Sequence, residues 1–411
     1  MNSQSLMNYM RAVFRFELFL LNLFNFLNMN PMNTNPNPTK ETRIVWLDLL
    51  RFVAILLVIS THCTDPLNAS MEARSNPECN FWGSAFGSLA RPCVPLFVMI
   101  TGMLLLPIKQ GMSAFYKKRI PRVLFPFIIW SILFNLAPWF IQWAGGSQEL
   151  VVQFFPWEPN PSDSFSDALI TILQIPVNFT VFATPMWYIY MLIGLYLYMP
   201  IFSAWVEKAS DKAKRFFLYL WGISLFIPYL MVFFNKYVFG TCSWNGFGVF
   251  YYFAGFNGYL LLGHYLGKAH TLHVRKLLGL CIPMLIIGYL TTFFGFRFMT
   301  ADPSVTEEGM ELFFTYCSPN VVLMTIPIFL LIKQVKINSQ RIRRILKNLT
   351  TCGFGIYCAH YFFIGPSYMF ACWLNTPIVL RVPVATLLTF VCTWAVVYLL
   401  SKLPKAKYLI G

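Results

Sequence analysis

Long apolar runs separated by short polar loops dominate this sequence. A helix needs about 20 mostly apolar residues to cross a bilayer. Runs of about this length occur near residues 44–64, 90–107, 122–143, 186–206, 214–234, 248–268, 274–296, 313–333, 350–372 and 378–400. Another apolar run, at 168–185, is interrupted by Pro176, Asn178 and Pro185, which favours a re-entrant or interfacial segment. The pattern predicts an all-α, polytopic membrane protein with about ten transmembrane helices.

The charges in the loops predict the orientation, since cytoplasmic loops carry an excess of Lys and Arg. With a cytoplasmic N-terminus, the inner segments 109–122, 208–215, 268–276, 333–347 and 402–407 carry five, four, three, six and three Lys or Arg residues. The outer loops and helix ends carry only Arg74, Arg91, Lys236, Arg297 and Arg381. We therefore expect both termini in the cytoplasm and a multi-pass protein of the cytoplasmic (inner) membrane.

Composition agrees with this class of protein. Of the 411 residues, 57% are hydrophobic and 11% are charged, whereas about a quarter of the residues in a soluble domain are charged. The net charge of +15 is spread over the short inner loops, so no nucleic-acid partner is expected. The ten cysteines show no metal-site spacing, and no metal is expected.

The first 42 residues differ from the rest. Residues 12–29 are apolar but contain Glu17 and several asparagines, and an Asn/Pro-rich linker follows. An interfacial helix is one interpretation. An extension from a mis-assigned start codon, with Met32 as the true start, is favoured because no candidate chemistry lies upstream. Residues 43–411 are then expected to form a single membrane domain.

The first predicted span carries an unusual polar stripe. His62 follows Arg51 by eleven positions, close to three helical turns, so both side chains share one face, about 16 Å apart along the axis. Asp48 and Asp65 fall on the same stripe. Ionisable groups within a membrane usually face a bundle interior or an aqueous cavity. The alternative is an Asp48–Arg51 pair at the inner interface, with His62 simply near the outer surface.

Several stretches resemble acyltransferase family 3, a family of bacterial membrane O-acyltransferases of surface polysaccharides and glycolipids. The stretch "RIVWLDLLRFVAILLVISTHC" resembles the family's first helix, in which ten residues separate an Arg or Lys from a His. Matches follow in order in "RPCVPLFVMITGMLLL", "FYKKRIPRVLFPFIIW" with its Arg-x-x-Arg pair, "MWYIYMLIGLYLYMPIF", "FGIYCAHYFF" and "LSKLPKAKYLIG". The resemblance covers about residues 43–411.

The resemblance implies transfer of an acyl group, commonly acetyl, from cytoplasmic acyl-CoA to a hydroxyl of a sugar or glycolipid. A sugar hydroxyl needs a general base to attack a thioester, and histidine suits this role near neutral pH. We expect His62 to be the base, with Asp65 or Asp48 orienting it, although Asp65 precedes Pro66 and is alternatively a helix cap. Arg51 is expected to meet the pantetheine arm or a phosphate of the donor, or to stabilise the oxyanion.

The donor's phosphates require cations near the cytoplasm. Arginine presents a planar fork suited to phosphate oxygens, and the Arg-x-x-Arg match points to Arg119, Arg122 and the adjacent Lys118 as donor-binding residues. Their alternative interpretation is positive-inside anchoring.

Acceptor binding has weaker sequence signals. Trp187 and Tyr188 are candidates for stacking on a sugar, and His360 is a candidate second polar group in the cavity. Interfacial anchoring and hydrogen-bonded packing are the respective alternatives.

A competing function is that of a transporter or flippase of a glycolipid or polysaccharide precursor, because a polar interior stripe also suits substrate movement. The hydropathy shows neither a clear inverted repeat nor paired broken helices. An acyltransferase is therefore the favoured interpretation, with the sugar or glycolipid acceptor, acyl-CoA and the bilayer as its partners. The acceptor's identity and the oligomeric state are left open.

Overall fold

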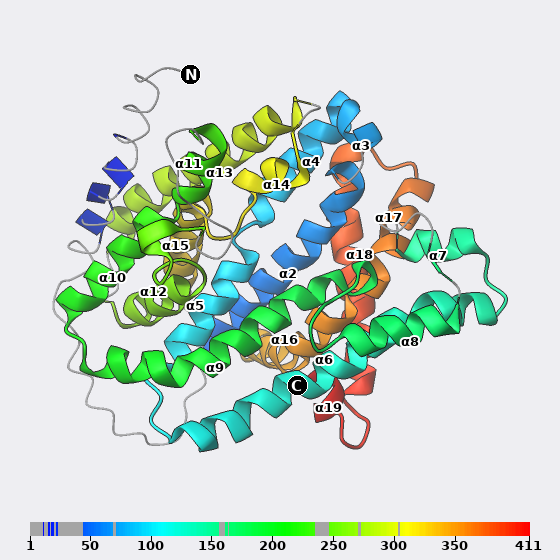
Figure 1. Cartoon of the computed structure of the whole chain (residues 1–411), viewed down its shortest axis with the longest axis horizontal. Helices are drawn as coiled ribbons and strands as arrows, with labels where there is room; N and C mark the ends of the chain where they lie inside the picture. The colour runs from blue at the N-terminus through cyan, green and yellow to red at the C-terminus, as the bar shows by residue number, and fades with distance from the viewer. Residues whose placement is uncertain are drawn as a thin grey trace. The chain divides into compact units, whose positions relative to one another are not determined.

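The computed structural model describes residues 44–68, 71–155, 161–162, 164–234, 246–269, 273–302 and 305–411, together with residues 11, 15, 16, 18, 19, 22 and 23. This part of the chain is 81% helical and contains no β-strand (Figure 1), which confirms the all-α prediction. The predicted N-terminal extension, residues 1–42, lies almost entirely outside the described residues.

Within the described ranges, seven helical segments are long and apolar enough to cross a membrane. They are Val45–Asn68, Pro77–Leu105, Met112–Trp143, Val181–Lys208, Asp211–Phe233, Val274–Thr300 and Ile378–Leu400. Each of them covers most or all of one predicted span. The chain is therefore a multi-pass membrane protein by the length and composition of its helices.

The other three predicted spans are shorter or broken. Within 248–268 the α-helix is limited to α12 (Asn257–Lys268), because Gly255, at a φ of 90°, turns the chain just before it. Within 313–333, α15 (Pro319–Lys333) begins at a proline and has 15 residues. A turn at His360 divides 350–372 between α16 (Gln340–Ala359) and α17 (Tyr361–Trp373). The count of ten spans thus stays a prediction.

The chain divides into two compact units, each built from segments far apart in the sequence. The first comprises Met1–Leu50, Val94–Ile108 and Ile201–Ile337, and the second comprises Arg51–Cys93, Lys109–Pro200 and Asn338–Gly411. The boundary passes through α2 (Val45–Asn68), the first turn of α5 (Cys93–Leu105) and α9 (Trp187–Lys208).

In the first unit, two helices cross at glycines. A Cβ atom on Gly102 of α5 (Cys93–Leu105) would lie 2.0 Å from the carbonyl oxygen of Leu260 of α12. Likewise, a Cβ atom on Gly263 of α12 would lie 2.1 Å from the carbonyl oxygen of Met99. Small residues let membrane helices approach this closely. The unit also contains α10 (Asp211–Ser224), α11 (Ile227–Phe233), η3 (Gly248–Phe250), α13 (Val274–Thr300), α14 (Glu307–Met310) and η4 (Glu311–Phe313).

Lys333 closes one end of α12. Its Nζ atom, at the end of α15, donates to the carbonyl oxygens of Leu266, Gly267 and Ala269 at 2.8, 2.9 and 2.7 Å. The last carbonyls of a helix lack partners within the helix, and a lysine can satisfy them. The sequence pattern had assigned Lys333 only to orientation; the structure also makes it a helix cap.

The second unit is organised around α6 (Met112–Trp143), the longest helix, with 32 residues. The short helix α19 (Lys407–Ile410) lies beside it (Figure 1). Trp130 of α6 holds α19 in place by donating from Nε1 to the carbonyl oxygen of Leu409 at 2.9 Å. The remaining elements are α3 (Met71–Ser75), α4 (Pro77–Ala90), α7 (Gln148–Phe154), α8 (Phe165–Gln174), η1 (Val181–Met186) and α18 (Ile378–Leu400).

Candidate functional site

Helix α2 runs unbroken through the polar stripe that the sequence predicts. Arg51 and His62 both lie within it, and so does Asp65, because the helix continues to Asn68. The interpretation of Asp65 as a cap at the helix end is therefore wrong. Eleven residues of continuous helix place Arg51 and His62 on one face, on the order of 16 Å apart.

His62 and Asp65 form a pair one turn apart. The Nδ1 atom of His62 lies 3.2 Å from Oδ2 of Asp65, and their side chains are 14% and 27% exposed. A carboxylate only accepts hydrogen bonds, so Nδ1 carries the proton in this pair. Nε2 of a neutral His62 then holds the lone pair. This is the arrangement of a histidine base oriented by a carboxylate.

A second histidine lies against the first. The ring centroids of His62 and His360 are 5.5 Å apart, and His360 is completely buried. Its Nδ1 donates to the carbonyl oxygen of Tyr357, whereas its Nε2 is buried without a hydrogen-bond partner. Tyr361 packs edge-on against the His62 ring, 5.3 Å away. The structure thus places His360 beside His62. The Nε2 atom of His360 is an acceptor that no hydrogen bond uses.

Tyr188 approaches the same cluster through Tyr357. The rings of Tyr188 and Tyr357 are 5.2 Å apart, and those of Tyr357 and His360 are 5.7 Å apart. Tyr188 is buried, while Trp187 is half-buried and lies 6.3 Å from Tyr188, ring to ring. Of the two predicted acceptor-binding aromatics, Tyr188 is therefore closer to the histidines.

Tyr196 of α9 is the second feature of the site, nearer the Arg51 end of the stripe. The charges of both Arg51 and Arg119 act on the buried phenol of Tyr196. Two contacts between α6 and α9 account for the proximity of Arg119: Phe115 packs against the Tyr196 ring at 6.0 Å, and Tyr116 donates to the carbonyl oxygen of Leu197 at 2.7 Å. Arg119 follows Phe115 by one helical turn and so faces the same way. Its Nε is buried without a hydrogen-bond partner.

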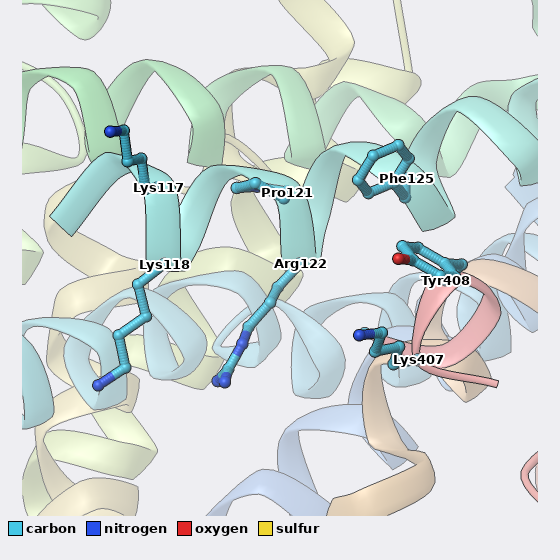
Figure 2. A pocket seen from close by; sticks show the side chains of 8 residues that line it. Lys117, Lys118, Pro121, Arg122, Phe125, Lys407 and Tyr408 are labelled. Carbon is cyan, nitrogen blue, oxygen red and sulfur yellow. The ribbon is translucent and has the colours of Figure 1, made fainter. Parts of the chain in front are cut away.

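The Arg-x-x-Arg pair divides between two locations. Arg119 faces Tyr196, whereas Arg122 is exposed and lines a groove between α6 and α19 together with Lys118 (Figure 2). The predicted donor-binding residues therefore do not form one cluster. Instead, they extend from the open groove to the interior of the unit.

Asp48 precedes His62 by fourteen positions on α2, about 21 Å along the helix axis. It is buried, at 3% exposure, and belongs to the first unit. The geometry of the second unit therefore supplies Asp65, and not Asp48, as the carboxylate for His62. Among the described residues, no group of three or more His, Cys, Asp or Glu side chains is placed to hold a metal ion.

Sequence reasoning missed Tyr196, Tyr357 and Tyr361, which connect the predicted residues. Aromatic residues make up 18% of the chain, so nothing in the sequence distinguishes these three from aromatics at lipid-facing or packing positions. Lys407 belongs to the basic tail that predicts the orientation in the membrane. The sequence does not indicate that this tail lies beside α6, because that contact depends on the fold.

Comparison with known proteins identifies the family of this chain. No curated protein and no solved structure matches the chain. A family model described as "Acyltransferase domain" (Acyl_transf_3) matches residues 44–399, which include α2, α6 and every predicted site residue. The chain therefore belongs to acyltransferase family 3, and it is a membrane acyltransferase.

Proposed function

We propose that this protein transfers an acyl group, most simply acetyl, from cytoplasmic acyl-CoA to a hydroxyl of a sugar in a surface polysaccharide or glycolipid. It acts in the cytoplasmic (inner) membrane, with ten spans and both termini in the cytoplasm. The observation that carries this proposal is the His62–Asp65 pair, 3.2 Å apart and partly exposed, on the helix that also bears Arg51.

In the proposed reaction, His62 acts as general base. Its Nε2 takes the proton of the acceptor hydroxyl while the hydroxyl oxygen attacks the thioester carbon. The tetrahedral intermediate then breaks its C–S bond, and the imidazolium of His62 gives the proton to the leaving CoA thiolate. Asp65 keeps Nδ1 protonated and stabilises the imidazolium while it exists.

The donor enters on the cationic side. Arg119 has a buried Nε without a hydrogen-bond partner, and its charge and that of Arg51 act on the same phenol, a combination suited to an anionic ligand. The separation of about 16 Å between Arg51 and His62 exceeds the reach of an arginine side chain. We therefore assign Arg51 to the pantetheine arm or a phosphate, and not to the oxyanion.

The acceptor meets the base from the aromatic side. His360 Nε2 is an unpartnered, fully buried acceptor, so we assign it to a hydroxyl of the sugar. Tyr188 and Trp187 supply an adjacent aromatic surface. Such surfaces favour sugars because the rings are apolar while tyrosine and tryptophan each keep a polar tip.

Replacing the base tests this function. His62→Ala is expected to lower kcat for acetyl transfer by about 10²–10⁴-fold, because the acceptor hydroxyl loses its proton acceptor. Acetyl-CoA consumption by protein in nanodiscs, and the mass of surface glycans from cells carrying the variant, measure the loss. An acetyl increment that disappears from a glycan also identifies the acceptor.

His273→Ala is the matched control, since His273 is exposed and belongs to the first unit. Full transfer by His62→Ala at equal protein level would show that the base is another group. If wild-type protein moved a glycolipid across the membrane without consuming thioester, the transporter function would replace the proposed one.

A further inference from the structure

The groove between α6 and α19 has no role in the chemistry described so far beyond Lys118 and Arg122. It has a volume of about 550 Å³ and is lined by Lys117, Lys118, Pro121, Arg122, Phe125, Lys407, Tyr408 and Gly411. All of these residues belong to the second unit. The volume lies within the range of roughly 300–1,000 Å³ that small-molecule sites occupy.

Helix α19 is held against α6 by specific contacts. The Trp130 indole donates to the carbonyl oxygen of Leu409, and Ile410 is buried against α16, where a Cβ on Gly355 would lie 2.9 Å from Ile410 Cγ2. These contacts fix the positions of the two preceding residues, Lys407 and Tyr408. The tail therefore forms a defined side of the groove.

The groove is strongly cationic. Figure 2 shows Lys118 and Arg122 extending from one side of α6 towards the side on which Lys407 lies, while Lys117 points the other way. Among the residues that the structure describes, Lys118, Arg122 and Lys407 form no ion pair with a carboxylate. Three exposed cations without an acidic neighbour attract an anion of more than one charge.

Aromatic rings lie at the same end of the groove as Lys407. Phe125 of α6 and Tyr408 of α19 meet edge to face, with ring centroids 5.0 Å apart, and are 45% and 37% exposed. Lys407 Nζ lies 5.2 Å from the centre of the Tyr408 ring. Exposed rings beside unpaired cations fit a ligand that carries both phosphates and an aromatic base, since bases stack on such rings.

We propose that α19 forms one side of the site for the nucleotide end of the acyl-CoA donor, with Lys407 binding a phosphate and Tyr408 and Phe125 contacting the adenine. This inference rests on the proposed function, which supplies acyl-CoA as the ligand. It adds the tail to the donor site and assigns Arg122 and Lys118 to the nucleotide. Arg119 and Arg51 remain for the pantetheine side.

Charge reversal at Lys407 tests the inference. Lys407→Glu is expected to weaken binding of CoA about tenfold, because one phosphate contact is lost and a like charge is introduced. Adenosine 3′,5′-bisphosphate, which lacks the pantetheine arm, should lose affinity by the same factor. Calorimetric titration of purified protein in phosphatidylcholine nanodiscs measures both. Turnover should show a raised KM for acetyl-CoA with kcat unchanged.

The matched control is Lys405→Glu, which reverses a charge two residues away that does not line the groove. Equal CoA affinity of Lys407→Glu and wild type would overturn the inference while leaving the proposed function intact. A wild-type protein that neither binds CoA nor consumes acetyl-CoA would overturn both.

A lipid headgroup offers the same phosphate chemistry, so the titration is repeated in nanodiscs containing phosphatidylglycerol. If Lys407 binds the nucleotide, the loss in Lys407→Glu persists in both lipids. If instead the variant loses CoA affinity in neither lipid but no longer retains phosphatidylglycerol, the groove is a lipid site and the inference is wrong.

Discussion

At the scale of single residues, the two ring nitrogens of His62 have different surroundings. Nδ1 faces the Asp65 carboxylate at 3.2 Å, and Nε2 is left to the substrate. An aspartate in this position both orients the imidazole ring and places a negative charge beside it. An asparagine amide oxygen would still accept the hydrogen bond from Nδ1 but would carry no charge.

This difference gives a graded prediction. Asp65→Asn is expected to lower kcat about tenfold, less than the loss for His62→Ala, because it removes only part of the general-base contribution. The kcat of Asp65→Ala should be lower than that of Asp65→Asn, since Nδ1 of His62 then loses its hydrogen-bond partner. Thioester consumption at saturating acetyl-CoA measures both variants. Wild-type turnover by Asp65→Ala would mean that Asp65 has no part in the reaction.

The sequence predicted the residues of one helix but not their partners. Arg51, His62 and Asp65 share a face because helical periodicity alone determines it, and the structure places all three in α2. Tyr196 and Tyr361 reach the stripe from α9 and α17, more than 100 residues along the chain. Local periodicity carries no information about such contacts, since they depend on how the helices pack.

At the scale of elements, the crossing of α5 and α12 depends on two glycines. Any side chain at Gly263 meets the backbone of Met99, which cannot rotate away as a side chain would. Gly263→Ala is therefore expected to lower the free energy of unfolding by about 1–3 kcal/mol. Thermal unfolding of detergent-solubilised protein, followed by size-exclusion chromatography, measures the loss.

The control is Gly279→Ala in α13, where a Cβ has no other atom within 4 Å. That change should be neutral or slightly stabilising, because alanine has the higher helix propensity. If Gly263→Ala unfolded at the same temperature as Gly279→Ala, α5 and α12 would not be in backbone contact.

The sequence predicts some helix boundaries accurately and misses others. The last span, 378–400, has the bounds of α18, Ile378–Leu400, because polar or turn-forming residues flank an unbroken apolar run. The break at His360 could not be predicted, since apolar residues continue on both sides of it. The His360 carbonyl there accepts from Phe363, three residues on, in a tighter turn than an α-helix makes.

At the scale of the whole molecule, the groove between α6 and α19 bears on the number of crossings. The start of α6 and the tail both line it, so they lie on the same side of the membrane. Of the seven long helical segments, five lie between the groove residues at the start of α6 and the tail, counting α6 itself. An odd number of crossings would put the two on opposite sides. The ten-span prediction, in which shorter segments cross as well, places eight crossings between them, an even number that agrees with the shared groove.

Reporter fusions test this topology. With ten spans, green fluorescent protein fused after Ala269 or after Lys402 is expected to fluoresce, because both positions are cytoplasmic. Alkaline phosphatase fused after Asn375 is expected to be active, because that position is outside. Seven spans reverse all three outcomes. Alkaline phosphatase that is inactive when fused after Asn375 but active when fused after Lys402 would therefore contradict ten spans.

The continuity of α2 has a consequence for which acyl groups the enzyme accepts. A continuous helix fixes the distance from Arg51 to His62, so in the proposed reaction every acyl-CoA would present its thioester at the same depth. The rings next to His62 belong to Tyr361 and, beyond it, to Phe134 and Phe362, which stack with their centroids 4.1 Å apart. Under the proposed function, binding of the CoA part and selection of the acyl group would then depend on different residues. If the proposed function holds, substitutions at Phe134 and Phe362 are expected to alter acyl preference without altering the groove between α6 and α19, which neither residue lines.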